Sequence, residues 1–381
     1  MKTGGVRTLL LGIIFLGIGI TAGKAFIDDR SLPPIYPGQG VTGVKKLSAY
    51  LPNLKGTAGD SDVYILDSGK EGGTLVLLGG THPDEPASNL AAILVIENVT
   101  VEKGKIIVIP EADRSAMTHN QPLEAYPARY HIFNDHGFKR TFAFGSRLAN
   151  QVDQLPDPDI YIHYPSEQKL SGEESRNLNR SYPGRPDGSF VERVAWGITT
   201  LVKVEKADLE IDLHEAPLEY FFINSMLTNR RGQDVATMAV FNLISQGIEM
   251  GLESAPKNLE GFSYSGIGDE TRAKTFLIEA ANPIQGRFRG ATTEKLILDG
   301  KDGCYLKASG LKRLFVPYDE KGLPLSLRTA RHIAAVKAII DSANELYPAG
   351  AINVSNWPDY GKAIENIGQY LNGPETAAAQ S

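Results

Sequence analysis

Residues 74–86 have the sequence TLVLLGGTHPDEP, which changes from a strand pattern to a helix pattern within a few positions. The apolar run 74–78 is typical of a buried strand, and the two glycines after it end that strand. Pro86 then opens a helical pattern, because proline is favoured at the first helical position. His82 and Glu85 therefore fall in the turn that leaves the strand. One imidazole nitrogen and one carboxylate there can hold one side of a zinc ion.

A catalytic zinc site needs a third protein ligand and a base for its water, and two later segments offer them. Residues 208–214 (DLEIDLH) are predicted to form a strand with His214 at its end, so His214 is the proposed third ligand. Residues 274–279 (KTFLIE) form another strand-like run, which ends in the carboxylate of Glu279. Glu279 could pair with a nearby basic residue, but a carboxylate that closes an apolar strand faces burial, which is costly without a partner, so a functional role is favoured.

A third polar segment, residues 176–184 (RNLNRSYPG), lies between these motifs in the chain. Its pair Asn179 and Arg180 suits the capture of a substrate carboxylate, because a guanidinium group binds two oxygens at once. Arg180 could instead donate a structural salt bridge, but its sequence context favours substrate capture. Tyr182 is a candidate pocket residue, with core packing as the ordinary alternative.

This ordered set of motifs resembles the zinc carboxypeptidase superfamily, and it is most similar to the succinylglutamate desuccinylase/aspartoacylase branch. That branch has HGNE where this chain has residues 82–85 (HPDE), and DLNR where this chain has residues 177–180 (NLNR). Each motif is weak alone, whereas four of them in order, from about residue 63 to about residue 347, are fairly specific.

The resemblance implies a zinc-dependent hydrolase of amide bonds with one zinc ion per chain, held by His82, Glu85 and His214. Asn179 and Arg180 would grip the substrate carboxylate. Glu279 would be the general base for the attacking, zinc-activated water.

The chain departs from the family at one position. The family often has an arginine seven residues before the Asn of its Asn-Arg pair, where it polarises the scissile carbonyl, and this chain has Gly172 there. Arg176 and Arg114 are the candidates to replace that arginine.

The N-terminus has the order of a secretory signal. Lys2 and Arg7 precede the apolar run 8–21, and small residues follow it. The run is short for a spanning helix, which needs roughly 20 residues, so a cleaved signal over residues 1–25 is favoured over a retained anchor. The sequence therefore predicts a secreted or bacterial periplasmic protein, with N-terminal membrane anchoring as the alternative.

Two substrate classes fit these residues. By resemblance, the enzyme is a deacylase that cleaves an N-acyl amino acid at the amide bond next to its carboxylate-bearing part. By location, a secreted metallocarboxypeptidase acting on peptides or cell-wall stem peptides is the alternative. A zinc-containing binding protein without catalysis is a third hypothesis, and the presence of Glu279 argues against it.

Composition excludes several other classes. The formal charge of −6 and the lack of a basic run argue against a nucleic-acid partner. Cys304 is the only cysteine, so an internal disulfide and a cysteine-rich zinc site are excluded, and we expect a buried, inert thiol. No GxSxG elbow or phosphate-cradling loop points to a serine hydrolase or a nucleotide-dependent enzyme.

Strand and helix patterns alternate from about residue 61, which predicts an α/β fold with a mixed, mostly parallel sheet and helices on both faces. Residues 26–60 are predicted to be an irregular leader and residues 348–381 a tail with a short helix near 360–371. Residues 61–347 would be the catalytic domain, with 287–326 as an inserted segment or lid near the site. The predicted strands cover residues 63–66, 74–78, 105–109, 160–162, 209–213, 220–224 and 275–278, and the predicted helices cover 86–96, 189–202, 234–250 and 328–346.

In sheets of this kind, functional sites form beyond the carboxyl ends of the strands, where the four motif residues are predicted to lie. Other polar residues are weaker candidates. His131 and His136 could bind metal, and His163 could line the pocket without touching metal. Glu215 could orient a ligand, select a basic substrate group or be a solvated loop charge. Tyr220 could line the pocket or pack in the core.

Overall fold

The computed structural model describes residues 3–120, 127–253 and 259–374, and eight strands of these residues form its central sheet. Four strand pairs are parallel and three are antiparallel, which confirms the predicted mixed, mostly parallel sheet. In order across the sheet, the strands are β1 (Gly43–Lys46), β2 (Asp62–Asp67), β5 (Lys105–Ile109), β3 (Thr74–Leu78), β10 (Leu209–Pro217), β13 (Lys274–Asn282), β11 (Ser225–Thr228) and β12 (Gly251–Leu252).

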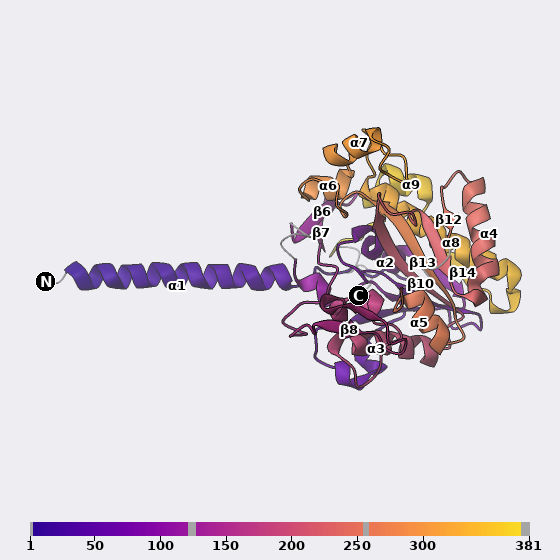
Figure 1. Ribbon diagram of the computed structural model, residues 1–381, viewed down its shortest axis with the longest axis horizontal. Helices are drawn as coiled ribbons and strands as arrows, with labels where there is room; N and C mark the ends of the chain where they lie inside the picture. Colours follow the sequence, from indigo (N-terminus) through magenta and orange to yellow (C-terminus); the bar gives the residue numbers. More distant parts are fainter. Residues whose placement is uncertain (1–2, 121–126, 254–258, 375–381) are drawn as a thin grey trace.

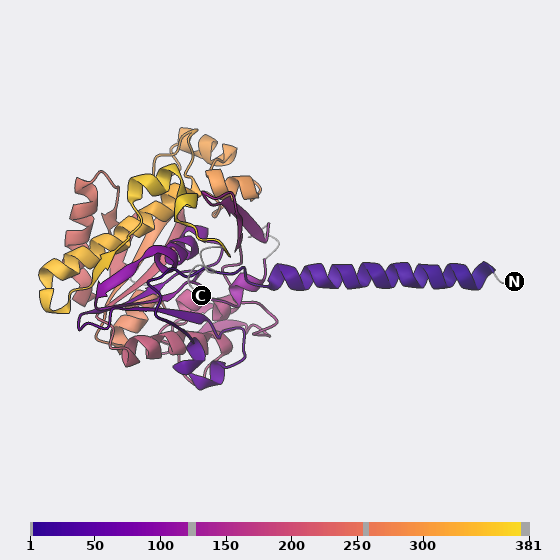
Figure 2. The ribbon, with the colours of Figure 1, turned by 180° about the vertical axis from the view of Figure 1, so that it is seen from behind.

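Helices cover both faces of this sheet, as Figures 1 and 2 show from opposite sides. Along β3, Leu75 and Leu77 belong to one buried cluster, and Val76 and Leu78 belong to the other. A strand that is covered on both faces needs apolar side chains at every position, which is why residues 74–78 are an unbroken apolar run. The first cluster holds side chains of α2 (Pro86–Asn98), α4 (Gln233–Ser245) and α8 (Leu325–Leu346), and the second holds those of α3 (Phe190–Val204) and α5 (Ser263–Glu270).

The turn between β3 and α2 is built by close packing. A Cβ atom at Gly79 would lie 2.7 Å from the Cβ atom of Ala92 on α2, and Gly80 has a φ of +64°. Pro86 is the first residue of α2, as predicted, and Glu85 is its N-cap. The Glu85 side chain makes no capping hydrogen bond, so its carboxylate is available for other partners.

The termini contain more structure than the sequence suggested. Part of the predicted leader is ordered, because α1 (Thr3–Arg30) continues into it and β1 forms an edge of the sheet. Three of the four β1 residues are exposed, so this strand shows no apolar alternation in the sequence. In the predicted tail, β14 (Asn353–Ser355) pairs with β4 (Thr100–Lys103), and α9 (Tyr360–Glu365) forms part of the predicted short helix.

Several local predictions were wrong. The strand expected over 220–224 begins only at Ser225, because Tyr220 and Phe221 are exposed in a turn and Asn224 has a φ of +48°. Cys304 is exposed rather than buried.

The segment 287–326 contains α6 (Glu294–Asp299) and α7 (Gly303–Gly310). The remaining strands form two small hairpins, β6 (Arg129–Phe133) with β7 (Lys139–Ala143) and β8 (Ile160–Ile162) with β9 (Lys169–Ser171).

The helix α1 projects away from the rest of the protein (Figure 1). Its stretch Gly5–Asp28 is long and apolar enough to cross a membrane, and none of it is buried. The helix is longer than the apolar run 8–21 on which the signal prediction was based. A signal sequence and a membrane anchor both have these properties.

A buried ion pair connects the β6–β7 hairpin, α2 and the C-terminal segment. Arg140 on β7 donates two hydrogen bonds to the Glu97 carboxylate on α2, at 2.9 and 2.8 Å. The backbone nitrogen of Asn372 donates to the same carboxylate at 2.7 Å. Arg140 and Glu97 are both almost fully buried, so neither charge can be solvated when the other is removed.

We therefore expect Arg140→Met to lower the free energy of unfolding by about 3–5 kcal/mol, because it leaves a buried carboxylate without its partner. The matched control is Lys337→Met, which removes an exposed ion pair with Asp341 on α8 and should cost less than about 1 kcal/mol. Urea denaturation of both variants measures the difference. An equal loss of unfolding free energy in the two variants would show that the buried ion pair stabilises the fold no more than the exposed pair does.

Candidate active site

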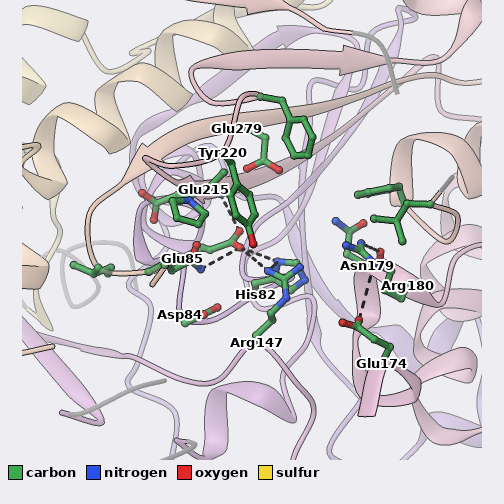
Figure 3. Close-up of a pocket in the computed structure, with 18 of the residues that line it drawn as sticks. His82, Asp84, Glu85, Arg147, Glu174, Asn179, Arg180, Glu215, Tyr220 and Glu279 are labelled. Atoms are coloured by element: carbon green, nitrogen blue, oxygen red, sulfur yellow. Dashed lines mark hydrogen bonds and ion pairs between the residues drawn. The ribbon is translucent and has the colours of Figure 1, made fainter. Parts of the chain in front are cut away.

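The structure brings His82, Glu85 and His214 together at the carboxyl edge of the sheet. Figure 3 shows His82 and Glu85 of this cluster, which line a pocket. His82 and Glu85 follow β3, and His214 lies on β10, which pairs with β3 in parallel. One ligand atom from each residue lies within 4.8 Å of the others, and all three residues are buried. The Oε1 atom of Glu85 is 2.8 Å from Nδ1 of His82, and its Oε2 atom is 3.0 Å from Nδ1 of His214.

The second nitrogen of each imidazole is fixed by another side chain. Nε2 of His82 lies 2.9 Å from Oδ1 of Asn177, and Nε2 of His214 lies 2.9 Å from Oδ2 of Asp212. Asp212 is itself held by the Thr81 hydroxyl, which donates to Oδ1 at 2.8 Å. Such partners orient metal-binding histidines and turn their Nδ1 atoms toward a common point. Two imidazole nitrogens and one carboxylate oxygen form a donor set that zinc prefers, so these residues fit the ion.

The charges of the three residues differ in the protein without metal. Burial lowers the pKa of His82 to about 4. Burial also acts to lower the pKa of His214, but the carboxylates of Asp212 and Glu85 outweigh it and raise this pKa well above its usual value. Burial acts to raise the pKa of Glu85, but the two imidazoles outweigh it and hold this pKa well below its usual value. A neutral His82 and an ionised Glu85 are ready to bind metal, whereas His214 has to release a proton first.

Glu279 lies beside this cluster on β13, opposite His214 in the parallel register of β10 and β13. It lines the same pocket as His82 and Glu85, and it is 8% exposed. Its Oε2 atom has no hydrogen-bond partner among the described residues. Burial raises the pKa of Glu279 to about 8, and the nearby Glu85 carboxylate adds to this shift. A buried carboxyl group without a partner in a pocket is suited to accept and donate protons.

The arginine next to the cluster is Arg147, which the sequence reasoning missed. Its Nη1 atom is 3.4 Å from Nδ1 of His82 and 3.5 Å from Oε1 of Glu85. Neither Arg176 nor Arg114, the two residues expected to polarise the carbonyl, is part of the pocket lining. Arg176 is instead paired with Asp157 through two hydrogen bonds of 2.7 and 2.9 Å.

Asn179 and Arg180 both line the pocket, as expected. The Arg180 guanidinium lies over the Phe262 ring at 4.5 Å, and its Nη1 atom donates to the Asn179 carbonyl at 2.6 Å. Burial, with Arg147 nearby, lowers the pKa of Arg180 to about 10, so the group stays charged at neutral pH. Tyr182 does not line the pocket, because its side chain is completely buried in the second apolar cluster.

The weaker candidates fall into two groups. Glu215 and Tyr220 line the pocket, but Glu215 is no solvated loop charge, because the buried Arg328 binds its carboxylate. His163 and His131 lie outside the pocket lining. The first contacts the Tyr182 carbonyl at 2.8 Å and the second contacts Glu294 at 2.8 Å. These two histidines therefore have structural partners.

The pocket has a volume of about 550 Å³, which is sufficient for a small molecule or the end of a peptide. Three arginines, Arg147, Arg180 and Arg289, line the pocket, and Figure 3 shows the first two near His82. The apolar part of its wall includes Tyr220, Phe222, Leu259, Phe262 and Ile284.

No family model matches this chain, and no curated protein matches it. Solved structures do resemble it. The succinylglutamate desuccinylase/aspartoacylase from Rhodobacter sphaeroides has 16% identity and a TM-score of 0.37, and the match covers 60% of this chain and 53% of that chain. The apo form of the cell shape determinant protein Csd4 from Helicobacter pylori has 14% identity and a TM-score of 0.42, with 77% and 54% covered.

An aspartoacylase family protein from Mesorhizobium loti has 18% identity and a TM-score of 0.35, with 58% and 55% covered. The matches thus span about half the length of these solved chains. The structural neighbours are succinylglutamate desuccinylase/aspartoacylase proteins and Csd4. A further Csd4 structure, bound to mDAP, is described as that of a D,L-carboxypeptidase. The first group is the family that the sequence motifs resemble.

If Asp212 orients His214, the Asp212→Ala variant should bind zinc about 10–100-fold more weakly than the unchanged protein. The matched control is Glu210→Gln, two residues earlier on the same strand, where burial raises the pKa of the carboxyl group well above its usual value. Competition with a chromophoric chelator measures both affinities. Unchanged zinc affinity in the Asp212 variant would contradict the orienting role.

The pKa of Glu279 predicts a pH effect on the stability of the metal-free protein. Because folding raises this pKa from about 4.3 to about 8, protonated Glu279 favours the folded state, and this contribution is lost as pH rises toward 8. The Glu279→Gln variant has no ionisable group at this position, so it does not have this pH dependence. The stability of the unchanged protein relative to this variant should therefore fall between about pH 5 and 8, by at most about 1.4 kcal/mol for each pH unit. Urea denaturation with a chelator present tests this, and a constant difference would contradict it.

Proposed function

We propose that the protein is a zinc-dependent hydrolase that cleaves an amide bond next to a carboxylate-bearing amino acid. The observation that supports this most directly is the buried cluster of two imidazoles and one carboxylate, with Glu279 beside it. His82, Glu85 and Glu279 line a pocket that also contains guanidinium groups. The donor set suits zinc, the unpaired carboxyl group suits proton transfer, and the guanidinium groups suit an anionic substrate.

His82, Glu85 and His214 would hold the zinc ion, which when bound lowers the pKa of a coordinated water toward about 7 and polarises a carbonyl group. Glu279 accepts a proton from the attacking water at its unpaired oxygen and then donates it to the leaving nitrogen. Its pKa of about 8 refers to the protein without metal, and a nearby cation lowers the pKa of a carboxyl group. Glu279 can therefore be ionised at neutral pH, as a base requires.

The arginines give the substrate its orientation. Arg180, stacked on Phe262 and held by the Asn179 carbonyl, presents a fixed positive charge for the substrate carboxylate. Arg147 lies next to His82 and Glu85, where a guanidinium group can donate hydrogen bonds to the oxygen that gains charge as the amide is attacked. Arg147 thus takes the role that the sequence assigned to Arg176 or Arg114.

The substrate class that we propose first is an N-acyl amino acid, so that the enzyme is a deacylase. The pocket of about 550 Å³ can enclose such a molecule, and no nucleic acid is expected as a partner of this acidic chain. A metallocarboxypeptidase acting on peptides or cell-wall stem peptides is the second candidate. The apolar helix α1 favours it, because a secreted or periplasmic enzyme, or one anchored in the membrane, meets such peptides.

We expect Glu279→Gln to keep its zinc and to lose about 10²–10⁴-fold in kcat, since the amide cannot accept the proton. Turnover of N-acyl amino acids and of peptides with a free C-terminus by the zinc-loaded protein provides the measurement. The control is His214→Ala, which should lose both zinc and turnover. Near-normal turnover by the Gln variant would show that Glu279 is not the general base. If the protein releases amino acids from peptides but not from N-acyl amino acids, the metallocarboxypeptidase is the correct candidate.

A further inference from the structure

Several exposed apolar side chains lie on segments near the pocket, and catalysis does not explain them. Leu311 and Phe315 follow helix α7 and are 71% and 65% exposed, and Phe221 is 61% exposed. Leu306 on α7 and Phe288 before α6 are also exposed. Large apolar side chains that cluster on a surface mark a contact with another molecule or with a membrane. We call these five residues the rim patch.

Backbone and side-chain contacts join the parts of the rim patch to each other and to the pocket. The backbone nitrogen of Phe315 donates to the carbonyl of Leu218 at 3.0 Å, two residues before Tyr220 of the pocket wall. Glu219 accepts hydrogen bonds from the Arg287 backbone at 2.6 Å and from the Tyr305 hydroxyl at 2.7 Å. The segments that carry the patch residues are thus in contact with each other near the pocket.

Positive charges surround the apolar side chains of this patch. The segment 286–318 has seven Lys and Arg residues and three Asp and Glu residues, so its net charge is +4, whereas the chain as a whole carries −6. Arg287, Lys307, Lys312 and Arg313 of this segment are exposed. Exposed apolar side chains with Lys and Arg beside them favour the interface of an anionic bilayer, where the apolar groups enter the acyl boundary and the cations meet the headgroups.

The base of α1 is connected to the same side of the protein. Arg129 on β6 donates hydrogen bonds to the backbone of Asp28 and Ser31, at the end of α1. His131, also on β6, contacts Glu294 at the start of α6 at 2.8 Å. Figures 1 and 2 both show the β6–β7 hairpin between the base of α1 and the helices α6 and α7. A membrane crossed by α1 would therefore lie near the rim patch.

We propose that the rim patch docks on an anionic lipid bilayer and holds the pocket mouth at the membrane surface. Three observations support it together: exposed aromatic and aliphatic side chains, a local positive charge in an acidic chain, and a continuous set of contacts to the base of a helix able to span a membrane. An acidic protein partner would match the charge alone, but it would leave the position of the patch near α1 without a reason. This docking is independent of the proposed hydrolase activity.

The chain offers a direct probe of this surface, because its only cysteine, Cys304, is exposed on α7 between the patch segments. The full chain, labelled at Cys304 with a polarity-sensitive fluorophore, is reconstituted into nanodiscs of phosphatidylcholine with or without phosphatidylglycerol. We expect a blue shift of the emission and quenching by brominated acyl chains in the anionic discs. Both should weaken in neutral discs and at high salt, which screens the attraction between exposed charges.

Substitutions in the rim patch distinguish its contribution to membrane contact from that of α1, because every variant retains α1. Leu311→Glu with Phe315→Glu should abolish the shift in both kinds of disc, and Lys312→Glu with Arg313→Glu should abolish the preference for anionic lipid. The matched control is Phe241→Glu, a 71% exposed residue on α4 outside the patch, which should behave as the unchanged chain does. Emission that does not depend on lipid composition, or equal loss in the Phe241 variant, would overturn the proposal.

Discussion

The carboxylate of Glu85 lies buried between the imidazoles of His82 and His214, and the rest of the site is arranged around this contact. Burying an ionised carboxylate costs several kcal/mol unless charges and hydrogen bonds surround it. The fold meets this requirement through parallel strands, because β3, β10 and β13 end at the same edge of the sheet and bring their residues together. These three residues could therefore hold a metal ion at this edge.

The contact of Glu85 with the two histidines also accounts for the polar and charged side chains that surround it. Asp212 and Asn177 hold the outer nitrogens of the two histidines, so the inner nitrogens can face Glu85. Next to them, one oxygen of Glu279 has no hydrogen-bond partner in the described part of the chain, and Arg147 supplies positive charge on the pocket side. In the function that we propose, the residues from the buried cluster to the open pocket would serve metal binding, proton transfer and substrate capture in turn.

The sequence predicts those parts of this arrangement that depend on local patterns. The strand, glycine turn and proline before α2 identify His82 and Glu85, and two apolar strands identify His214 and Glu279. The sequence does not predict a role for Arg147, because this residue lies in no recognisable motif or periodic pattern. Only the tertiary fold brings it next to His82. For the same reason the sequence offers Arg176 as a candidate and does not show that Asp157, nineteen residues away in the chain, binds it. The edge strand β1 was missed because most of its side chains are exposed.

X-ray absorption at the zinc edge of the zinc-loaded protein tests the central claim most directly. The account predicts a first shell of nitrogen and oxygen atoms at about 2.0–2.2 Å, with the outer-shell scattering of two imidazoles and without sulfur. One imidazole should disappear from the spectrum of a His214→Ala sample that retains any zinc. A shell of oxygen atoms alone, or a spectrum unchanged by this substitution, would mean that zinc binds elsewhere and would contradict the account.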